Sequence, residues 1–466
     1  MTSEHTPVLI VGAGPAGLVA AITLARNGVD SLVVERRPAP SAEPRATAVS
    51  VWSMELFRSW GLADRLSARA LDVDLVGWIG ETLTGPGSEI PLGYPTRAQS
   101  AVFSPVAPAC LPQDELEPIL LEHLRELPLG SVEFGAELEA LDHAEGGVRA
   151  KLRDASGDTR MVEARFAIGA DGAHSSVRGE LAIETRGPGA ILEAVSALFH
   201  APLWRLIQDR RYGLFPVTRG HAAGVFVPAG LGDRWIYGFT GEPGTIDAAD
   251  WGPGQVAELI RTASGVRGLD VQVERVTGFS YTAEIADSFR EGSVFLTGDA
   301  AHRVSPRGGT GMNMAIRDGH DLGWKLAWVL AGWAPDELLD SYEAERRPVA
   351  QHNLERSVDD EGSVRPVSEE IHVDLGGRIP HLWLGDGRST LDLLGPGLTL
   401  FTGPWGDEPR PDPLYGSAPV ETRRLSAVAA RGLGIPQGGS LLVRPDGVPA
   451  RTATRAALAG VGSAAS

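Results

Sequence analysis

Apolar positions in the first 35 residues follow the period of a strand, then of a helix, then of a strand again. Residues 8–11 are a short β-branched run, residues 18–26 form an apolar helical stretch closed by Asn27 and Gly28, and residues 31–35 are a second strand. Two strands joined by one helix within about thirty residues form a βαβ unit, the half-fold that binds nucleotides.

Between residues 50 and 168 the pattern predicts mixed structure. Residues 50–72 and 114–127 have apolar positions at helical spacing, whereas residues 131–168 consist of short alternating runs typical of a small antiparallel ribbon. The ribbon ends in a predicted strand at residues 165–168.

A separate sheet is predicted over residues 182–285, where β-rich segments are separated by glycine and proline turns. Residues 294–297 then form a buried strand and residues 313–330 a long helix, so the chain is expected to return to the first domain. Beyond residue 375 the chain is rich in Gly and Pro and holds two short candidate strands.

The composition narrows the range of partners. The chain has 466 residues, 43% of them hydrophobic, which allows two or three domains with sizeable cores. Its formal net charge of -18 repels phosphate backbones and anionic membrane surfaces. We therefore expect neither nucleic acid nor a membrane among its partners.

A single cysteine, Cys110, rules out an intramolecular disulfide, a cysteine-based zinc site and a Cys-x-x-Cys redox pair. His302 and His320 lack companions at metal-ligand spacing, so no metal site is expected. The apolar stretch 8–25 follows a leader without basic residues, unlike a signal peptide, and no other segment has the roughly 18 apolar residues of a membrane span. These features predict a cytoplasmic protein.

Three segments place glycines and polar residues at the ends of predicted strands. The first, Gly12 to Gly17, is a G-x-G-x-x-G between a strand and a helix: its glycines permit a tight turn, close approach of a pyrophosphate, and helix packing. Glu35 ends the second strand, where its carboxylate can accept both ribose hydroxyls and repels a 2′-phosphate. The motif predicts bound FAD or NAD rather than NADP; a structural glycine turn is the alternative.

The second segment runs from Gly169 to Arg178 and carries Asp171 directly after a predicted strand. The alternative interpretation is a turn with an N-capped helix, because Asp and Ser favour such positions. The third segment runs from Gly298 to Asn313. In it, Asp299 can accept hydrogen bonds from a ribityl chain, and backbone N–H groups at the helix start can face the electron-rich edge of a flavin.

In this order and spacing the three segments resemble those of the class A flavoprotein monooxygenases, the p-hydroxybenzoate hydroxylase-like group, over roughly residues 6–350. The resemblance implies an FAD enzyme and adds Arg45 and Gln113 as contacts of the cofactor. The predicted cofactor-binding residues are Gly12, Gly14, Pro15, Ala16, Gly17, Glu35, Arg36, Arg45, Gln113, Asp171, Asp299, Gly311, Met312 and Asn313. One departure is Asp321, where the family more often has Asn.

The resemblance implies an α/β fold with a Rossmann-like FAD-binding domain in residues 1–181 and 286–374 and an inserted β-sheet substrate domain in residues 182–285. Residues 375–466 resemble the thioredoxin-like domain of phenol and polyketide hydroxylases. Because this domain has no cysteine, it cannot perform thiol chemistry. We expect it to serve in packing or in the contacts of a homodimer.

The resemblance also implies a reaction. NADPH or NADH reduces the flavin from a transient groove, and the reduced flavin combines with O₂ to give a C4a-hydroperoxide that hydroxylates an aromatic, phenolic or polyketide-type substrate. Pro306, Gly308 and Gly309 are the candidate wall beside the flavin, because missing side chains would leave room for a peroxide. Steric filler is the alternative.

The inserted sheet supplies the candidates for the substrate pocket. A base that removes a phenolic proton would activate the ring, and the sheet offers two tyrosines and a histidine for that role. Aromatic side chains could line the pocket, although alternating aromatics in strands are more often ordinary core. The predicted pocket residues are Tyr212, Phe215, His221, Phe226, Trp235 and Tyr237.

Two other functions stay open from the residues alone. A dehydrogenase, a halogenase or a Baeyer–Villiger oxygenase can share the same FAD domain. A non-catalytic flavoprotein would bind an aromatic intermediate without oxidising it. Reduction of the bound flavin by NAD(P)H separates the enzymes from the binding protein.

Overall fold

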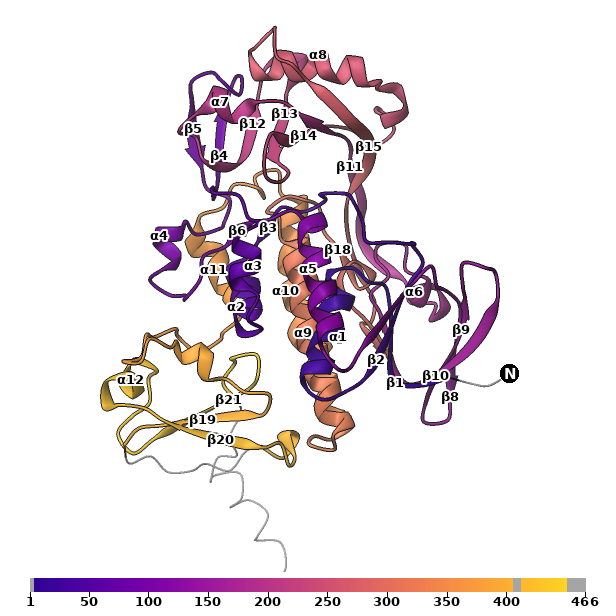
Figure 1. Ribbon diagram of the computed structural model, residues 1–466, viewed down its shortest axis with the longest axis vertical. Helices are drawn as coiled ribbons and strands as arrows, with labels where there is room; N and C mark the ends of the chain where they lie inside the picture. Colours follow the sequence, from indigo (N-terminus) through magenta and orange to yellow (C-terminus); the bar gives the residue numbers. More distant parts are fainter. Residues whose placement is uncertain (1–3, 405–411, 451–466) are drawn as a thin grey trace, which may run out of the picture.

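Two eight-stranded sheets and a small sheet organise the chain, which a computed structural model describes over residues 4–404 and 412–450 (Figure 1). In the first sheet, β17, β10, β1, β2 and β7 are parallel neighbours, β16 lies at one edge, and β9 and β8 extend from β10. Its strands are β1 (Glu4–Val11), β2 (Ser31–Glu35), β7 (Ser131–Phe134), β8 (Glu137–Ala144), β9 (Gly147–Arg153), β10 (Thr159–Gly169), β16 (Arg290–Glu291) and β17 (Val294–Leu296). The predicted α/β fold is confirmed.

Helices α1 (Pro15–Arg26), α5 (Gln113–Glu126) and α9 (Gly311–Leu330) pack beside this sheet (Figure 1). Helix α9 lies close to α1 because two glycines of α9 face α1. A Cβ on Gly319 would lie 2.3 Å from the carbonyl oxygen of Ala16. Gly323 faces Thr23 in the same way. The two helices therefore run in the same direction, and their N-termini lie at the same end of the molecule.

The second sheet has the strand order β18-β15-β11-β14-β13-β12-β4-β5. Helix α8 (Pro253–Ser264) packs on one of its faces over an apolar core. Its strands are β4 (Asp74–Gly80), β5 (Gly87–Ile90), β11 (Thr185–His200), β12 (Tyr212–Val217), β13 (Gly224–Pro228), β14 (Arg234–Gly241), β15 (Gln272–Ala286) and β18 (His302–Arg303).

This sheet draws on more of the chain than residues 182–285. Strands β4 and β5 come from residues 74–90, inside the predicted first domain, and β18 comes from residues 302–303. The sequence did not reveal this because β12 pairs with β4 across more than 130 residues, a contact that no local pattern encodes. The proposed division into domains at residues 182 and 285 thus leaves part of the sheet outside the insertion.

The described part of the chain after residue 375 packs beside the C-terminal half of α9, at the lower left of Figure 1. Its small sheet has the order β20-β19-β21, with β19 (Leu398–Thr402) parallel to β20 (Val420–Arg424) and antiparallel to β21 (Ser440–Val443). Trp324 and Trp328 of α9 pack against Leu398 and Leu400. The thioredoxin-like assignment stays a prediction, and the parts of it that fall on residues 405–411 and 451–466 lie outside the described residues.

A buried group of charges also joins α9 to this segment. Lys325, fully buried, donates to Asp321 at 2.7 Å and to Glu345 at 3.0 Å, while Arg444 pairs with Glu345 at 2.7 Å and with Asp446 at 2.5 Å. The three carboxylates lie within 4.8 Å of one another, and the two cations stand between them. Asp321, the departure from the family pattern, is thus the partner of Lys325.

The remaining elements complete the framework. They are β3 (Ala48–Val49), β6 (Ala109–Cys110), α2 (Val51–Ser59), α3 (Ala63–Ser67), α4 (Arg97–Ser100), α6 (Ser176–Glu180), α7 (Leu203–Ile207), α10 (Asp340–Val358), α11 (Val367–Leu375) and α12 (Ala427–Gly432). The single helix predicted over residues 50–72 is two helices, because the chain turns at Gly61 with φ +79°. Among the described residues, no helix combines the length and the apolarity needed to cross a bilayer.

Candidate cofactor-binding and active site

The glycine turn after β1 shows which glycines the protein itself requires. Gly12 has φ +109°, and a Cβ there would lie 2.2 Å from the carbonyl oxygen of Ala170. A Cβ on Gly17 would lie 1.9 Å from the carbonyl oxygen of Gly12. Both are therefore needed for packing. Gly14 is different, because a Cβ there would meet nothing within 4 Å. Its missing side chain leaves open space in front of the turn.

Helix α1 begins beside that open space. Its N-cap is Gly14, no side chain caps the first turn, and Pro15 occupies the first helical position. The backbone N–H groups of the first turn are therefore available to a ligand, and the helix dipole favours an anion. An open cradle at an uncapped helix N-terminus fits the pyrophosphate of FAD.

Glu35 lies at the end of β2 next to this turn. It is 6% exposed and accepts from the backbone N–H of Ala13 at 3.0 Å and from Nε of Arg37 at 2.9 Å. Burial acts to raise the pKa of Glu35, but the hydrogen bonds from Arg37 and Ala13 outweigh it and lower that pKa. The carboxylate is therefore ionised, held in place, and able to accept further hydrogen bonds from ribose hydroxyls.

The three segments meet at one edge of the first sheet. Val11 pairs with Gly169 across β1 and β10, and Gly169 pairs with Leu296 across β10 and β17. The residues after these strand ends therefore lie side by side. Gly298 closes the group, because a Cβ on it would lie 3.4 Å from Cβ of Ala16 in α1.

The side chain of Asp171 caps a helix. It accepts from Oγ of Ser175 at 2.5 Å and from the backbone N–H of Val177 at 3.1 Å, at the start of α6. Burial raises its pKa, and the hydrogen bond from Ser175 opposes that shift. The capping interpretation therefore describes the position of this carboxylate, and direct contact with the cofactor stays a prediction.

Arg178, at the end of the second segment, ties it to the third. Its Nη1 donates to the carbonyl oxygen of Ala300 at 2.9 Å and its Nη2 to that of Ala173 at 3.0 Å. The sequence motif includes this arginine, but its role was missed. The feature that could have indicated this role is that Arg178 lies two residues after the start of a helix, and that this helix begins beside two loops.

Asp299 lies in a short 3-10 turn, η3 (Gly298–Ala300), directly after β17. Its side chain is open to solvent, yet it lies deep enough among protein atoms for burial to raise its pKa. The positive charges of His302, Arg303 and Arg45 oppose that shift. The turn thus presents a carboxylate in a concave place, as the ribityl contact requires.

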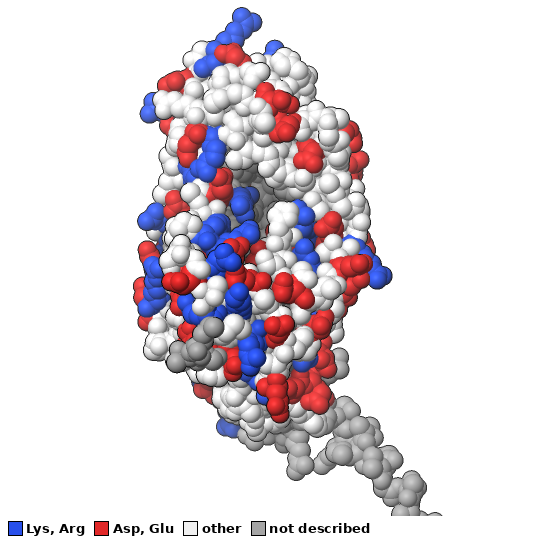
Figure 2. Space-filling model, turned by 90° about the vertical axis from the view of Figure 1, so that its right-hand side faces the viewer, with Lys and Arg blue, Asp and Glu red and all other residues white. Residues whose placement is uncertain are grey.

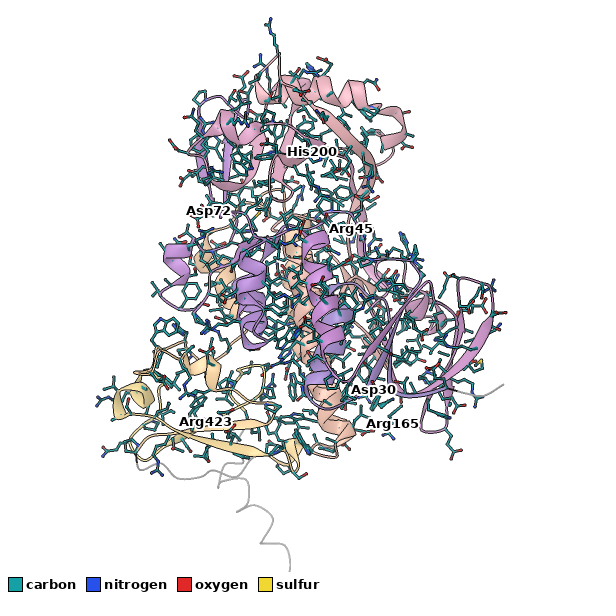
Figure 3. The ribbon with its side chains drawn as sticks, viewed as in Figure 1. Asp30, Arg45, Asp72, Arg165, His200 and Arg423 are labelled. Atoms are coloured by element: carbon teal, nitrogen blue, oxygen red, sulfur yellow. The ribbon has the colours of Figure 1, made fainter. Side chains whose placement is uncertain are left out.

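Arg45 and Gln113 lie together beside this region. Arg45 is exposed and has no ion pair among residues 4–404 and 412–450, and Figure 3 shows it between the second sheet and the first domain. The backbone N–H of Gln113 donates to the carbonyl oxygen of Ala46 at 2.8 Å, and its side-chain Nε2 donates to buried Glu117 at 2.7 Å. Within the described part of the chain no group donates to the amide oxygen of Gln113, so this oxygen can accept from a ligand.

Figure 2 shows the surface on the side seen at the right of Figure 1. This face has a hollow, and Lys and Arg side chains gather beside and below it. On a chain of net charge -18, such a gathering favours an anionic ligand.

The loop before α9 has a different reason for its glycines than the one inferred from sequence. Gly308 and Gly309 have φ +83° and +64°. A Cβ on Gly308 would lie 2.3 Å from Cζ of Arg356, so a guanidinium already fills the space that was predicted to be free for a peroxide. The space argument is wrong at Gly308, and a place for Pro306, Gly308 and Gly309 beside the flavin stays a prediction.

Asn313 holds the start of α9 to the chain around β3. Its Oδ1 accepts from the backbone N–H of Ser50 at 2.8 Å and from Oγ of Ser53 at 3.0 Å, and its Nδ2 donates to the carbonyl oxygen of Ala48 at 2.9 Å. The side chain is therefore committed to the protein. A cofactor contact from residues Gly311 to Asn313 would use the backbone N–H groups of the helix start, which no side chain caps.

A cavity of about 60 Å³ lies behind this loop. Its lining includes Tyr94, Asn313, Arg317, Arg356 and Asp374. Tyr94 donates to the carbonyl oxygen of Gly309 at 2.8 Å, and burial followed by the charge of Arg346 lowers the pKa of Arg317 to about 10. The cavity is far below the several hundred Å³ of a drug-sized ligand site, so it does not hold a polycyclic substrate. Sequence reasoning missed it because its walls come from distant segments.

The predicted aromatic pocket is the core of the second sheet. Phe215, Phe226, Trp235 and Tyr237 are each 0% exposed and pack in one cluster with residues of α8. Side chains alternate between the two faces of a sheet, so these four side chains point toward α8 and not toward the other face of the second sheet. Their assignment to the substrate pocket is therefore corrected to core, the alternative stated for alternating aromatics.

The three candidate bases also lie outside the face of the second sheet that meets the first domain, or are hydrogen-bonded to other groups. Tyr237 donates to the carbonyl oxygen of Ala222 at 2.8 Å inside that core, and His221 is exposed in the turn beside α8. Tyr212 donates to Glu89 at the sheet edge, and that bond together with burial raises its pKa to about 12. None of them is placed to remove a proton from a ring at the first domain.

The opposite face of the second sheet is the one that meets the first domain. Arg234 on β14 pairs with Asp114 of α5 at 2.8 Å, and Arg275 on β15 pairs with Glu43. Ile236 shares this face, because it is two residues from Arg234 and pairs with Val227. By the same register, the partly buried apolar residues of this face include Pro216, Val225, Val227 and Ile236.

Comparison with known proteins agrees with this geometry. The model of the family described as FAD binding domain matches residues 5–357. Tetracenomycin A2 monooxygenase-dioxygenase of Streptomyces glaucescens is 33% identical, over 96% of this chain and 93% of the relative.

Two solved structures share the fold over nearly the whole length. The flavin-dependent monooxygenase PieE, in complex with FAD and substrate, superposes with a TM-score of 0.87 and 28% identity over 97% of this chain and 96% of PieE. Aklavinone-11 hydroxylase, in a ternary complex with FAD and aklavinone, gives a TM-score of 0.85 and 30% identity over the same shares.

Proposed function

This chain belongs to the FAD binding domain family of flavin-dependent monooxygenases, and from that premise we propose that it hydroxylates a polycyclic aromatic substrate of the polyketide type. It is an FAD-dependent aromatic hydroxylase, and FAD is its cofactor. Relatives that match over most of the chain are named as monooxygenases and hydroxylases, so the dehydrogenase, halogenase and non-catalytic alternatives are not favoured.

One observation carries the assignment of the cofactor site. Gly14 is the glycine of the first motif that protein packing does not require, and it borders open space at an uncapped helix start. A glycine at such a position lets a group from outside the protein approach the backbone closely. The pyrophosphate of FAD is the group that the rest of the motif, with Glu35 beside it, fits.

Each part of the cofactor then has a residue that suits it. Glu35 holds the ribose of the ADP half, and Asp299 faces the ribityl chain with Arg45 close enough to balance its charge. The N-terminus of α9 directs backbone N–H groups toward the electron-rich pyrimidine edge of the ring system. When bound, FAD supplies hydride acceptance from NADH or NADPH and the activation of O₂.

The substrate lies, in this proposal, between that ring system and the face of the second sheet that carries Pro216, Val225, Val227 and Ile236. These apolar side chains suit a flat ring system, because they offer contact area without competing hydrogen bonds. The salt bridges Arg234–Asp114 and Arg275–Glu43 hold the face at a set distance from the first domain. The role of the apolar side chains and the salt bridges together is to position a planar molecule and exclude water.

The purified full-length protein tests this function. Its visible spectrum should show bound flavin, and an electron-rich polycyclic phenol should stimulate oxidation of NADH or NADPH. One atom of ¹⁸O from ¹⁸O₂ should appear in the product, since a monooxygenase transfers one oxygen atom. Oxidation of NAD(P)H that yields only hydrogen peroxide with every planar phenol tested would contradict the proposal.

A further inference from the structure

One buried carboxylate contacts the η3 turn from both sides. Asp318 of α9 is 0% exposed. Its Oδ2 accepts from the backbone N–H of Gly298 at 3.1 Å and lies 2.6 Å from Nε2 of His302. Its Oδ1 accepts from Nε of Arg346 at 2.7 Å. Residues 298 and 302 flank Asp299, so a single side chain holds the turn before and after it.

The charge of Asp318 is secure. Burial acts to raise the pKa of Asp318, but His302 and Arg346 outweigh it and hold that pKa well below its usual range. An ionised carboxylate only accepts, so Nε2 of His302 carries a proton and donates to it. His302, which the sequence did not support as a metal ligand, thus joins Asp318 in holding the turn; this pair is the clamp.

Arg178 holds the turn at the carbonyl oxygen of Ala300, and Asp318 adds contacts on either side of Asp299. Gly298 has φ +57°, and no side chain caps the start of η3. The backbone hydrogen bond of the turn closes on the carbonyl oxygen of Gly298 itself. Asp299 must keep its carboxylate in the concave place although burial disfavours the charge there. A turn held at both ends loses less freedom when a ligand binds, and this raises affinity.

We propose that Asp318 is a positioning residue for the cofactor: by holding Gly298 and His302 it keeps Asp299 facing the ribityl chain. This inference rests on the proposed function, because it takes Asp299 to be a contact of FAD. It adds a residue that does not reach the cofactor and acts through one that does.

Dissociation of FAD from the full-length holoenzyme tests the inference in a double-mutant cycle. Asp318→Asn replaces one carboxylate oxygen by an NH2 group, so the side chain can no longer accept from Gly298 and His302 on one side and from Arg346 on the other. We expect the dissociation constant for FAD to rise about tenfold. Asp299→Ala should also raise it. If Asp318 acts through Asp299, the double variant binds FAD within about twofold of Asp299→Ala.

Additive losses in the double variant, or an unchanged dissociation constant in Asp318→Asn, would overturn the inference. The two proposals fail differently: a wild-type protein that takes up no FAD refutes the proposed function, whereas failure of the cycle leaves flavin binding intact. An Asp299→Ala variant with wild-type affinity, beside a weakened Asp318→Asn, also overturns the route through Asp299.

Two further variants separate positioning from loss of structure. Asp321→Asn removes a buried carboxylate one turn along α9 that pairs with Lys325, away from the turn; it should lower the melting temperature and leave FAD affinity unchanged. If Asp318→Asn does not fold, His302→Leu replaces it, because Arg346 still neutralises Asp318. His302→Leu should weaken FAD binding and His302→Gln, which keeps a donor, should restore it; equal affinities for both would overturn the inference.

Discussion

Glycines that look alike in the sequence differ in what they serve. Gly12 and Gly17 are held by carbonyl oxygens at 2.2 and 1.9 Å from their would-be Cβ atoms, whereas nothing faces Gly14 within 4 Å. The same motif therefore contains two packing positions and one position that faces open space. The distinction yields a test that separates folding from cofactor binding.

Gly14→Ala should fold normally and bind FAD weakly. Its backbone, at φ -78°, suits alanine, and the new methyl meets no protein atom, but it stands where the pyrophosphate approaches. We expect the melting temperature of the FAD-free protein to change by less than a few degrees and the dissociation constant for FAD to rise at least tenfold.

Gly17→Ala is the matched control. Its methyl would press on the carbonyl oxygen of Gly12, so it should destabilise the FAD-free protein itself, by about 1–3 kcal/mol. Thermal unfolding and FAD titration of both variants give the answer. A Gly14→Ala protein that binds FAD as tightly as wild type would mean that no ligand occupies the open space.

At the scale of elements, the two faces of the second sheet have separate functions. One face buries Phe226 and Tyr237 under α8, and the other carries Ile236 and Val227 toward the first domain. A shift of one residue along a strand moves a side chain from one role to the other.

Ile236→Trp should interfere with the substrate and leave the fold intact. The larger side chain enters the space between the sheet and the first domain, so KM for the aromatic substrate should rise about tenfold or more. FAD affinity and the melting temperature should stay near wild type. Steady-state kinetics with a fixed NAD(P)H concentration measure the change.

Phe226→Ala tests the other face. It should cost about 3–5 kcal/mol of unfolding free energy, because it leaves a cavity in the core beneath α8, with little effect on KM in the folded fraction. Urea unfolding measures it. If Phe226→Ala changed KM and Ile236→Trp did not, the assignment of faces would be reversed.

At the scale of the whole molecule, the buried charges around Lys325 hold the C-terminal segment to the cofactor domain. Arg444→Ala would leave Glu345 and Asp446 close together with Lys325 as their remaining cation. Removing one partner of a buried pair typically costs about 3–5 kcal/mol. We expect a loss of unfolding free energy of that order at pH 7.

The loss should shrink as the solution becomes acidic. Although burial acts to raise the pKa of Asp446, Arg444 outweighs it and lowers that pKa. A lowered pKa gives stability that is present above the unfolded value, about 3.9, and is lost as the pH falls through the folded value. Wild type loses this advantage as the pH falls below about 4, while Arg444→Ala never had it. Urea unfolding of both proteins at pH 7 and about pH 3 should show a smaller difference at the lower pH; a constant difference would contradict the role of charge.

The local elements around the candidate cofactor site could be predicted from short patterns in the sequence. Gly12 to Gly17, Glu35 and Asp299 each lie next to a strand end, and the parallel sheet then brings all strand ends to one edge. Those short segments predicted an α/β fold and a site for FAD or NAD, and their resemblance to the class A flavoprotein monooxygenases implied FAD. The physical reason is that a turn, a helix start and a strand end are determined by neighbours within a few residues.

The substrate side could not be obtained that way. Which face of β12 to β14 is covered depends on α8 and on a pairing with β4, both far away in sequence. Gly308 makes room for Arg356, about 50 residues further on, and Asp171 turned out to cap α6. Alternation along a strand gives two equivalent faces, and the packing of distant elements selects between them. The amino-acid sequence by itself therefore determined the turns at the strand ends and the resemblance to FAD enzymes, and only the tertiary structure decided which face of the second sheet is turned toward the first domain.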